Sequence, residues 1–140
     1  MLDHEPYIRQ RLEGIPGCRG VHGMVDFDSV SAAGKQLPAI LVGADGYRVA
    51  GRSGQNKGVQ IAVRWLIVVA GRNVARIRDG APARGTVSQV AGAAMSRLAG
   101  WRPPDCQEFR PEDGYRPIHE AGLLLFPLAF TSRIFIEATP

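Results

Sequence analysis

The sequence is poor in cysteine and histidine, and this scarcity excludes several classes of protein. Two cysteines cannot build a disulfide framework, and no paired Cys-x-x-Cys motif offers zinc ligands. A reducing, cytosolic setting is the simpler interpretation. Cys18 and His22 lie four residues apart, but the glycines and proline around Cys18 argue against a shared helix. We therefore expect no metal site from these residues, which are Cys18, Cys106, His4, His22 and His119.

Long hydrophobic runs are also missing. The longest near-continuous apolar stretch is Leu123–Phe130, far short of the ~20 residues needed to cross a bilayer. The N-terminal segment carries Asp3 and Glu5, where an export signal would have basic residues followed by an apolar run. We expect neither export nor a role in a membrane.

Catalytic and phosphate-binding motifs are absent as well. The glycine-rich segment Gly51–Gly58 has Lys57 followed by glycine and a strand, whereas a Walker loop needs Gly-Lys-Ser/Thr and a helix. There is no Gly-x-Ser-x-Gly elbow, and no serine has an evident histidine partner. The adjacent carboxylates Glu112 and Asp113 lie in a Pro/Gly-rich stretch typical of solvated turns. We therefore expect no enzyme, no catalytic residues and no cofactor.

Lysine is scarce, because fifteen of the seventeen basic residues are arginine. A GC-rich genome would explain this composition, and so would a surface that meets acidic or phosphate groups, to which arginine binds bidentately. The stretch Arg48–Arg84 holds eight bases and one acid, Asp79, whereas Asp105–Glu120 holds five acids and two bases. The sequence thus separates charges of opposite sign along the chain.

Length and hydrophobicity predict one domain over residues 1–140. At 140 residues with 45% hydrophobic residues, the chain is long enough to bury a sizeable core. Helical spacing of apolar residues predicts one helix near residues 7–15, closed by Ile15-Pro16-Gly17, and a second over residues 87–98 that ends at Gly100. The second helix could start at Pro82 or at a capping box of Thr86 and Gln89.

Alternating apolar residues predict the strands, and the clearest pattern is Val59–Ala70, whose unbroken apolar face includes Trp65. Pro127 in the last strand indicates a bulge or an edge position. Asp45-Gly46 predicts a tight turn between two strands. The expected strands cover residues 21–27, 38–42, 47–50, 59–70, 106–110 (weak) and 122–136. The fold class is therefore α+β, a mostly antiparallel sheet of four to six strands with two main helices packed on it.

The order of these elements resembles the tail terminator, or tail completion, family of long-tailed phages and prophages in its Mu-like branch. The resemblance spans nearly the whole chain, and its most distinctive motif is the corner Leu98-x-Gly100-Trp101-x-Pro103 after a helix. Four further features carry it: Ile15-Pro16-Gly17, the Pro38-Ala39-Ile40 strand, the Trp65 strand with its Gly71-Arg72-Asn73 turn, and a closing strand through Phe126–Phe130.

The resemblance implies a subunit of a homo-hexameric ring. Such a ring caps the tail tube, terminates its polymerisation and contacts the head connector, with nucleic acid only passing through. It implies a structural protein without catalysis, made in the bacterial host cytoplasm and located in the virion tail after assembly.

Ring contacts can be suggested only from charge and hydrophobicity. A closed ring needs two different, complementary patches on each subunit. We predict that arginines of the basic stretch contact acids of the next subunit, and that two phenylalanines of the last strand contribute apolar surface. The arginines could instead face the tube or connector, or be merely solvated. The candidates are Arg72, Arg76, Arg78, Arg84, Asp105, Glu108, Glu112, Asp113, Phe126 and Phe130.

A second hypothesis is a small basic module that binds nucleic acid or a protein partner. It would use the Arg48–Arg84 bases, but Tyr47 and Trp65 are the only aromatics among them, and Trp65 is expected in the core. Salt-sensitive DNA binding would favour this hypothesis, and a particle near six times 15.1 kDa would favour the ring.

Overall fold

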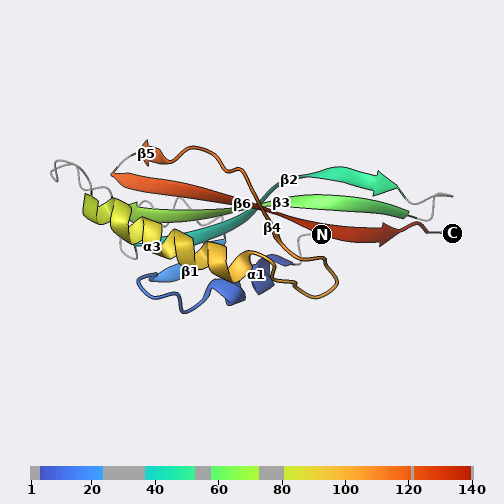
Figure 1. The fold of residues 1–140 in the computed structure, drawn as a ribbon, viewed down its shortest axis with the longest axis horizontal. Helices are drawn as coiled ribbons and strands as arrows, with labels where there is room; N and C mark the ends of the chain where they lie inside the picture. Colours follow the sequence, from blue (N-terminus) through green and yellow to red (C-terminus); the bar gives the residue numbers. More distant parts are fainter. Residues whose placement is uncertain (1–3, 24–36, 53–57, 73–80, 121, 140) are drawn as a thin grey trace.

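The part of the chain that the structure describes folds into a twisted sheet with two helices on one face, as Figure 1 shows. The computed structural model describes residues 4–23, 37–52, 58–72, 81–120 and 122–139. The sheet has six strands in the order β1-β2-β3-β6-β4, with β5 also paired to β6. The α+β class with two helices and a mostly antiparallel sheet is confirmed. In chain order the elements are α1 (Glu5–Leu12), β1 (Gly20–Gly23), β2 (Ala39–Arg52), β3 (Gly58–Arg72), α3 (Ala81–Leu98), β4 (Arg110–Glu112), β5 (Ile118–Glu120) and β6 (Leu123–Glu137).

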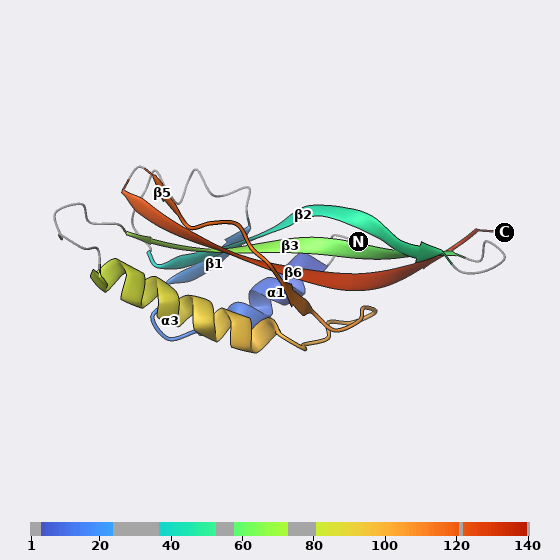
Figure 2. The same ribbon diagram turned by 45° about the horizontal axis from the view of Figure 1, so that its top comes forward.

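Three long antiparallel strands, β2, β3 and β6, form the body of the sheet. The pairing of β3 with β6 runs unbroken from Gly58 opposite Glu137 to Arg72 opposite Leu123. The three strands extend well past the helices (Figure 2). We call the projecting part the arm and define it as residues 47–52, 58–63 and 132–137.

Among the described strands, only β1 and β2 pair in parallel, which makes the sheet mixed. The connection between them spans residues 24–36, which lie outside the described residues, together with residues 37–38. The strand predicted over residues 21–27 is therefore confirmed only as far as Gly23.

Between the helices and the sheet lies the main hydrophobic core. Helix α1 contributes Ile8 and Leu12 to this core, and α3 contributes the face that includes Val90, Ala94 and Leu98. These residues follow the helical spacing seen in the sequence, so the predicted inward faces are confirmed. The first turn of α3 contains Pro82, which settles the choice of start in favour of proline rather than the capping box.

The C-terminal ends of the two helices are joined by reciprocal arginine hydrogen bonds. Arg97 donates to the carbonyl oxygens of Arg11 (3.3 Å) and Glu13 (2.6 Å), and Arg11 Nε donates to the carbonyl of Arg97 (3.1 Å). Carbonyls at a helix end lack partners within the helix and carry partial negative charge. Each guanidinium thus supplies the cation that the other helix end favours.

The Gly-Trp corner after α3 closes a loop. Gly100 has φ +77°, and its N–H donates to the carbonyl of Phe109 (2.9 Å), while the Phe109 N–H donates to the carbonyl of Trp101 (2.8 Å). The Trp101 and Phe109 rings meet edge to face at 5.4 Å, and Phe109 is fully buried beside Phe130. The loop 101–109 therefore seals one end of the main core.

From Leu123 to Thr131, β6 is largely buried on both faces, because a second, smaller cluster lies on the side of the sheet away from the helices. Leu124, Leu128 and Phe130 belong to the main core, whereas Leu123 and Leu125 pack with β2 and β3 residues in the second cluster. Coverage of both faces of the terminal strand is thus found within one chain.

Pro127 lies at a local edge of β6 without a bulge. It pairs in register with Val68 of β3, while β4 and β5 cover β6 only at residues 129–131 and 123–125. Its carbonyl oxygen lies close to Gly114, where an added Cβ would come within 2.7 Å. The N and O of a strand residue point to the same side, so the missing N–H faces Gly114 and costs the β3 ladder nothing. The edge interpretation holds here, and the bulge is wrong.

The predicted turn at Asp45-Gly46 is wrong. Residues 39–52 form one continuous strand, and the dipeptide forms a bulge between Ala44 and Tyr47, with Gly46 at φ +88°. A positive φ suits a bulge as well as a hairpin turn. Continued pairing with the long β3 keeps the chain straight, so no hairpin forms.

The weak strand predicted over residues 106–110 is also wrong except at its last residue. Strand β4 is Arg110–Glu112, which includes Pro111 from the predicted loop. Residues 106–109 instead fold under the edge of β6, where the Gln107 N–H donates to the carbonyl of Arg133 (3.0 Å).

Replacing Trp65 with alanine should destabilise the protein by about 3–5 kcal/mol, the usual cost of truncating a buried tryptophan. Trp65 is 1% exposed, and its Nε1–H donates to Ser132 Oγ (3.1 Å) inside the core. Urea denaturation followed by circular dichroism measures the loss. Trp65→Phe, which keeps most of the apolar volume, should lose clearly less. A Trp65→Ala protein as stable as the parent would contradict the core assignment.

A matched pair of glycine substitutions tests the bulge. No atom lies within 4 Å of an added Cβ at either Gly46 or Gly92, but only Gly46 has a positive φ. Gly46→Ala should therefore lower the free energy of unfolding by about 1–2 kcal/mol through backbone strain alone. Gly92→Ala, in the exposed face of α3, should instead raise the free energy of unfolding by about 0.5–1 kcal/mol, because alanine favours the helix. Equal effects in thermal unfolding would rule out the strained conformation at Gly46.

Candidate interaction surface

Beyond the helices, the two faces of the arm differ in chemistry. Alternate residues of a strand point to opposite faces. On the face turned toward the helices, β3 presents Val59, Ile61 and Val63, and on the other face Gln60, Ala62 and Arg64. Most residues opposite them on β2 and β6 continue this division, with Arg48 and Arg133 opposite Ala62, but the half-exposed Phe135 lies opposite Gln60 on the polar face. The arm is therefore amphipathic.

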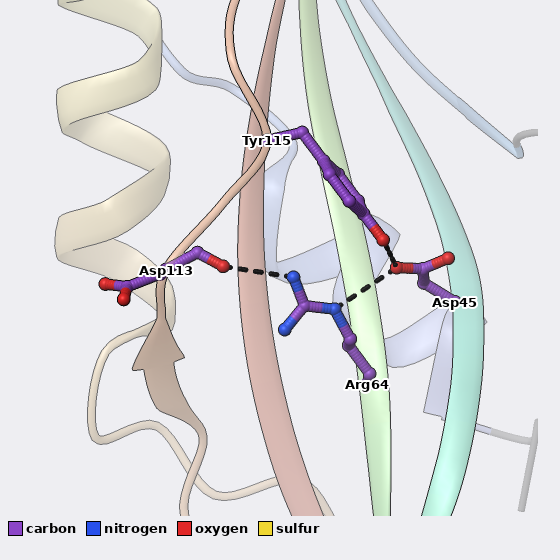
Figure 3. A network of polar contacts seen from close by, with 4 residues as sticks. All are labelled: Asp45, Arg64, Asp113 and Tyr115. Carbon is purple, nitrogen blue, oxygen red and sulfur yellow. Dashed lines mark hydrogen bonds and ion pairs between the residues drawn. The ribbon is translucent and has the colours of Figure 1, made fainter.

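A polar network crosses the sheet on the face away from the helices (Figure 3). Arg64 Nε donates to Asp45 Oδ2 (3.1 Å), and Arg64 Nη2 donates to the carbonyl oxygen of Asp113 (3.0 Å). The Tyr115 hydroxyl donates to the same Asp45 oxygen (2.8 Å), and its ring lies 5.5 Å from the Arg64 guanidinium. This network ties the exposed segment 113–117 to β2 and β3, far from it in sequence.

Beside the network lies an open polar groove of about 230 Å³. The residues that line it include Arg48, Ala62, Arg64, Glu112 and Thr131. The Thr131 hydroxyl donates to Glu112 Oε1 (2.9 Å). Both positive and negative groups line this hollow, which suits contact with a protein surface better than capture of a small anion.

The predicted acidic candidates are all exposed and lie along one side of the sheet. Asp105 and Glu108 are in the loop 101–109 beneath the edge of β6, and Glu112 is in β4, which pairs with the same strand. The carboxylate of Asp113 points away from the polar network (Figure 3). The structure therefore gathers these four acids on the β6 side of the molecule.

The predicted basic candidates are only partly described. Arg72 is exposed at the end of β3, opposite Leu123. It lies about 20 Å along the sheet from Glu112, since six residues of β6 at about 3.3 Å each separate their partners. Arg76 and Arg78 lie outside the described residues, as does the side chain of Arg84.

The two phenylalanine candidates belong to the chain's own core. Phe130 is fully buried between Phe109 and the β3 side chains. Phe126 is partly buried against the same core and lines an apolar hollow of about 340 Å³ near the start of α3. We therefore leave Phe130 out of any proposed interface, because none of its surface is accessible.

Exposed apolar residues on the arm were missed from the sequence. Tyr47 is 63% exposed, Val49 53%, Phe135 52% and Ile136 40%. The alternation that marks them as strand residues does not say where the helices stop covering the sheet. A signal was present nonetheless, because apolar residues still alternate in Val59–Ile61 and Ile134–Ile136 is apolar throughout, near the ends of their strands.

Neither thiol is suited to nucleophilic chemistry. Burial raises the pKa of both Cys18 and Cys106 above the usual thiol value, so little thiolate is present near neutral pH. Among the described residues, no three histidine, cysteine or acidic side chains converge on a point that could hold a metal ion. No helix in the described part of the chain is long and apolar enough to cross a membrane.

Arg64→Gln should loosen the segment 113–117, because it removes an ion pair and weakens the contact with the Asp113 carbonyl. Both charged side chains are about one-third exposed, so solvent screening limits the loss to about 1 kcal/mol. Amide hydrogen exchange in this segment should accelerate roughly fivefold. Arg110→Gln, at a nearby exposed arginine outside the network, is the control. Unchanged exchange in Arg64→Gln would show that other contacts hold the segment.

Comparisons with known proteins agree with the fold. A model of the phage tail terminator protein family matches residues 1–140. A solved chain from "Virion of native gene transfer agent (GTA) particle" superimposes with a TM-score of 0.55 and 18% identity, covering 91% of each chain. A search of curated proteins found no match. The chain therefore belongs to the phage tail terminator protein family, whose members are structural, non-catalytic components of the virion.

Proposed function

We propose that this protein forms a homo-hexameric ring that caps the tail tube of a phage-like particle. The ring terminates polymerisation of the tube protein and presents its other surface to the head–tail connector. The observation that carries the proposal is the family match over the full chain, residues 1–140. The protein is then made in the host cytoplasm and ends in the tail, and nucleic acid only passes through the ring. The Mu-like prophage branch, suggested by the corner at Gly100–Pro103, is part of this proposal.

The separation of opposite charges along the sheet is consistent with the two different patches that a ring contact needs. Closed rings larger than a dimer use head-to-tail contacts, in which two different patches of each subunit meet. The acids Asp105, Glu108, Glu112 and Asp113 lie on one side of the sheet, and Arg72 lies about 20 Å away along it. We propose that the acidic side faces arginines of the next subunit. The sequence-based candidates for those arginines are Arg72, Arg76, Arg78 and Arg84.

Two measurements test the ring together: the mass of the particle in solution and the growth of the tube. Light scattering after size-exclusion chromatography should give a mass near six times the 15.1 kDa of the chain. Added to polymerising tube protein from the same particle, the ring should stop growth and bind at one end of the tube. A monomer at high protein concentration, together with uninterrupted tube growth, would rule out this function.

Reversing the acidic side should weaken the ring. In Glu108→Lys/Asp113→Lys, two exposed carboxylates become cations, which should repel the arginines of the next subunit and shift the mass toward the monomer. Each exposed pair contributes only about 0.2–1 kcal/mol, so the shift should be partial and should increase as protein is diluted. Glu5→Lys/Glu13→Lys, at α1, makes the same change in net charge and should stay assembled. If both variants dissociate equally, the effect is one of net charge and not of this surface.

A further inference from the structure

The arm carries an apolar face that its own chain covers only in part, because Ile61 and Val63 are buried whereas Tyr47, Val49 and Ile136 are exposed. On β2, Tyr47 pairs in register with Val63, and Val49 with Ile61. On the other side of β3, Ile136 pairs with Val59. These side chains therefore share the face turned toward the helices, but the helices end before the arm does (Figure 2). The exposed members are Tyr47 and Val49 on β2 and Ile136 on β6, and they flank the apolar β3 residues Val59, Ile61 and Val63, so each side of the arm presents exposed apolar surface.

Both long edges of the arm offer backbone groups for pairing. Strand β1 covers β2 only from Ala39 to Val42, and among the described residues no strand pairs with the outer edge of β2 beyond that point. On the opposite edge, β4 covers β6 only up to Thr131, and a single hydrogen bond from Gln107 reaches Arg133. Edges of this length are normally protected in a soluble chain. The two edges belong to different strands, so each can pair with the other in a second copy.

Charge distinguishes the two edges. Arg48 on β2 is exposed, and its guanidinium makes no hydrogen bond or ion pair with any described residue. The β6 side instead carries the exposed acids Asp105, Glu108 and Asp113, with the exposed arginines Arg102 and Arg110 among them. A contact between the β2 side of one copy and the β6 side of the next can place Arg48 beside these acids, whereas β2 against β2 would bring two Arg48 side chains together. The position of Arg48 therefore favours a second copy in head-to-tail orientation.

We propose that the arm is the subunit contact: the β2 edge of one copy, with Tyr47, Val49 and Arg48, seats against the β6 side of the next copy, with Ile136 and Glu108. Apolar burial supplies most of the association, and the charges set its direction. This inference rests on the proposed ring, and it assigns the basic half of the contact to Arg48 rather than to the end of β3 at Arg72.

Substitution of the patch tests the apolar contact. Val49→Arg places a charge in the centre of the proposed contact and should convert rings into monomers at micromolar concentrations, with a roughly tenfold or greater rise in the dissociation constant. Ile118→Arg is the matched control, because Ile118 is 45% exposed in another strand away from the arm. Circular dichroism should show both variants folded. If Val49→Arg remains hexameric like the control, the arm is not the subunit contact, and the ring itself still stands.

A charge swap tests the direction of the contact. Arg48→Glu and Glu108→Arg should each weaken the ring, and the two together should restore it, because the new pair attracts again. Combining Glu108→Arg with Arg76→Glu/Arg78→Glu should not restore the ring. Restoration only by the second combination would overturn the assignment to Arg48 while leaving the proposed ring intact. A wild-type protein that is monomeric at every concentration tested would instead contradict the proposed ring and, with it, this inference.

Engineered thiols provide a direct measurement. In a Cys18→Ser/Cys106→Ser background, co-expressed Val49→Cys and Ile136→Cys chains, each with a single cysteine, should be joined by a short bismaleimide into dimers. Either single-cysteine variant alone should give no dimer, since a head-to-tail contact places position 49 opposite 136 and not opposite itself. Dimers from Val49→Cys alone would indicate a two-fold contact and would overturn the proposal. If, in the presence of tube protein, Val49→Cys is cross-linked only to that protein, the exposed apolar residues of the arm bind the tube, and the proposal is overturned.

Discussion

The unbroken antiparallel pairing of β3 with β6 is the constraint on which the rest of the structure depends. Fifteen consecutive residues of each strand are held in register, so every side chain on them is assigned to one face. Trp65 and Phe130 fall opposite each other on the face of the helices, and Thr131 falls beside Arg64 on the other. A slip of one residue would exchange the two faces throughout. The buried hydrogen bond from Trp65 to Ser132 opposes such a slip, because both partners are desolvated.

Elements with strong local patterns could be predicted from the sequence. The strand with Trp65, the long α3 and its end at Gly100 each combine regular spacing with a strong terminator, and each was found close to its expected position. Asp45-Gly46 shows where local reasoning fails. The dipeptide supplies a positive φ at Gly46, but only the neighbouring β3 decides whether that backbone closes a hairpin or forms a bulge.

The candidate surface was harder to predict because it depends on which residues the fold leaves uncovered. The exposed acids could be identified from composition, since carboxylates without a buried partner stay in water. Phe130 and Val49 could not be told apart in the same way. Both are apolar strand residues, yet the loop 101–109 buries the first, whereas the helices end before they would cover the second. The sequence around Arg64 likewise does not predict its contacts with Asp45 and the Asp113 carbonyl, because these groups come from segments distant in sequence.

The closure of the loop 101–109 has a consequence for how this fold can vary. The two backbone hydrogen bonds between Gly100–Trp101 and Phe109 fix both ends of the loop, independently of what lies between them. The entropy cost of a longer loop between fixed ends grows only with the logarithm of its length. Residues 102–105, of which all but Pro103 are exposed, can therefore accept insertions while the core beneath them stays closed. Descendants of one ancestral subunit could thus acquire new surfaces at this loop without altering the sheet that supports it.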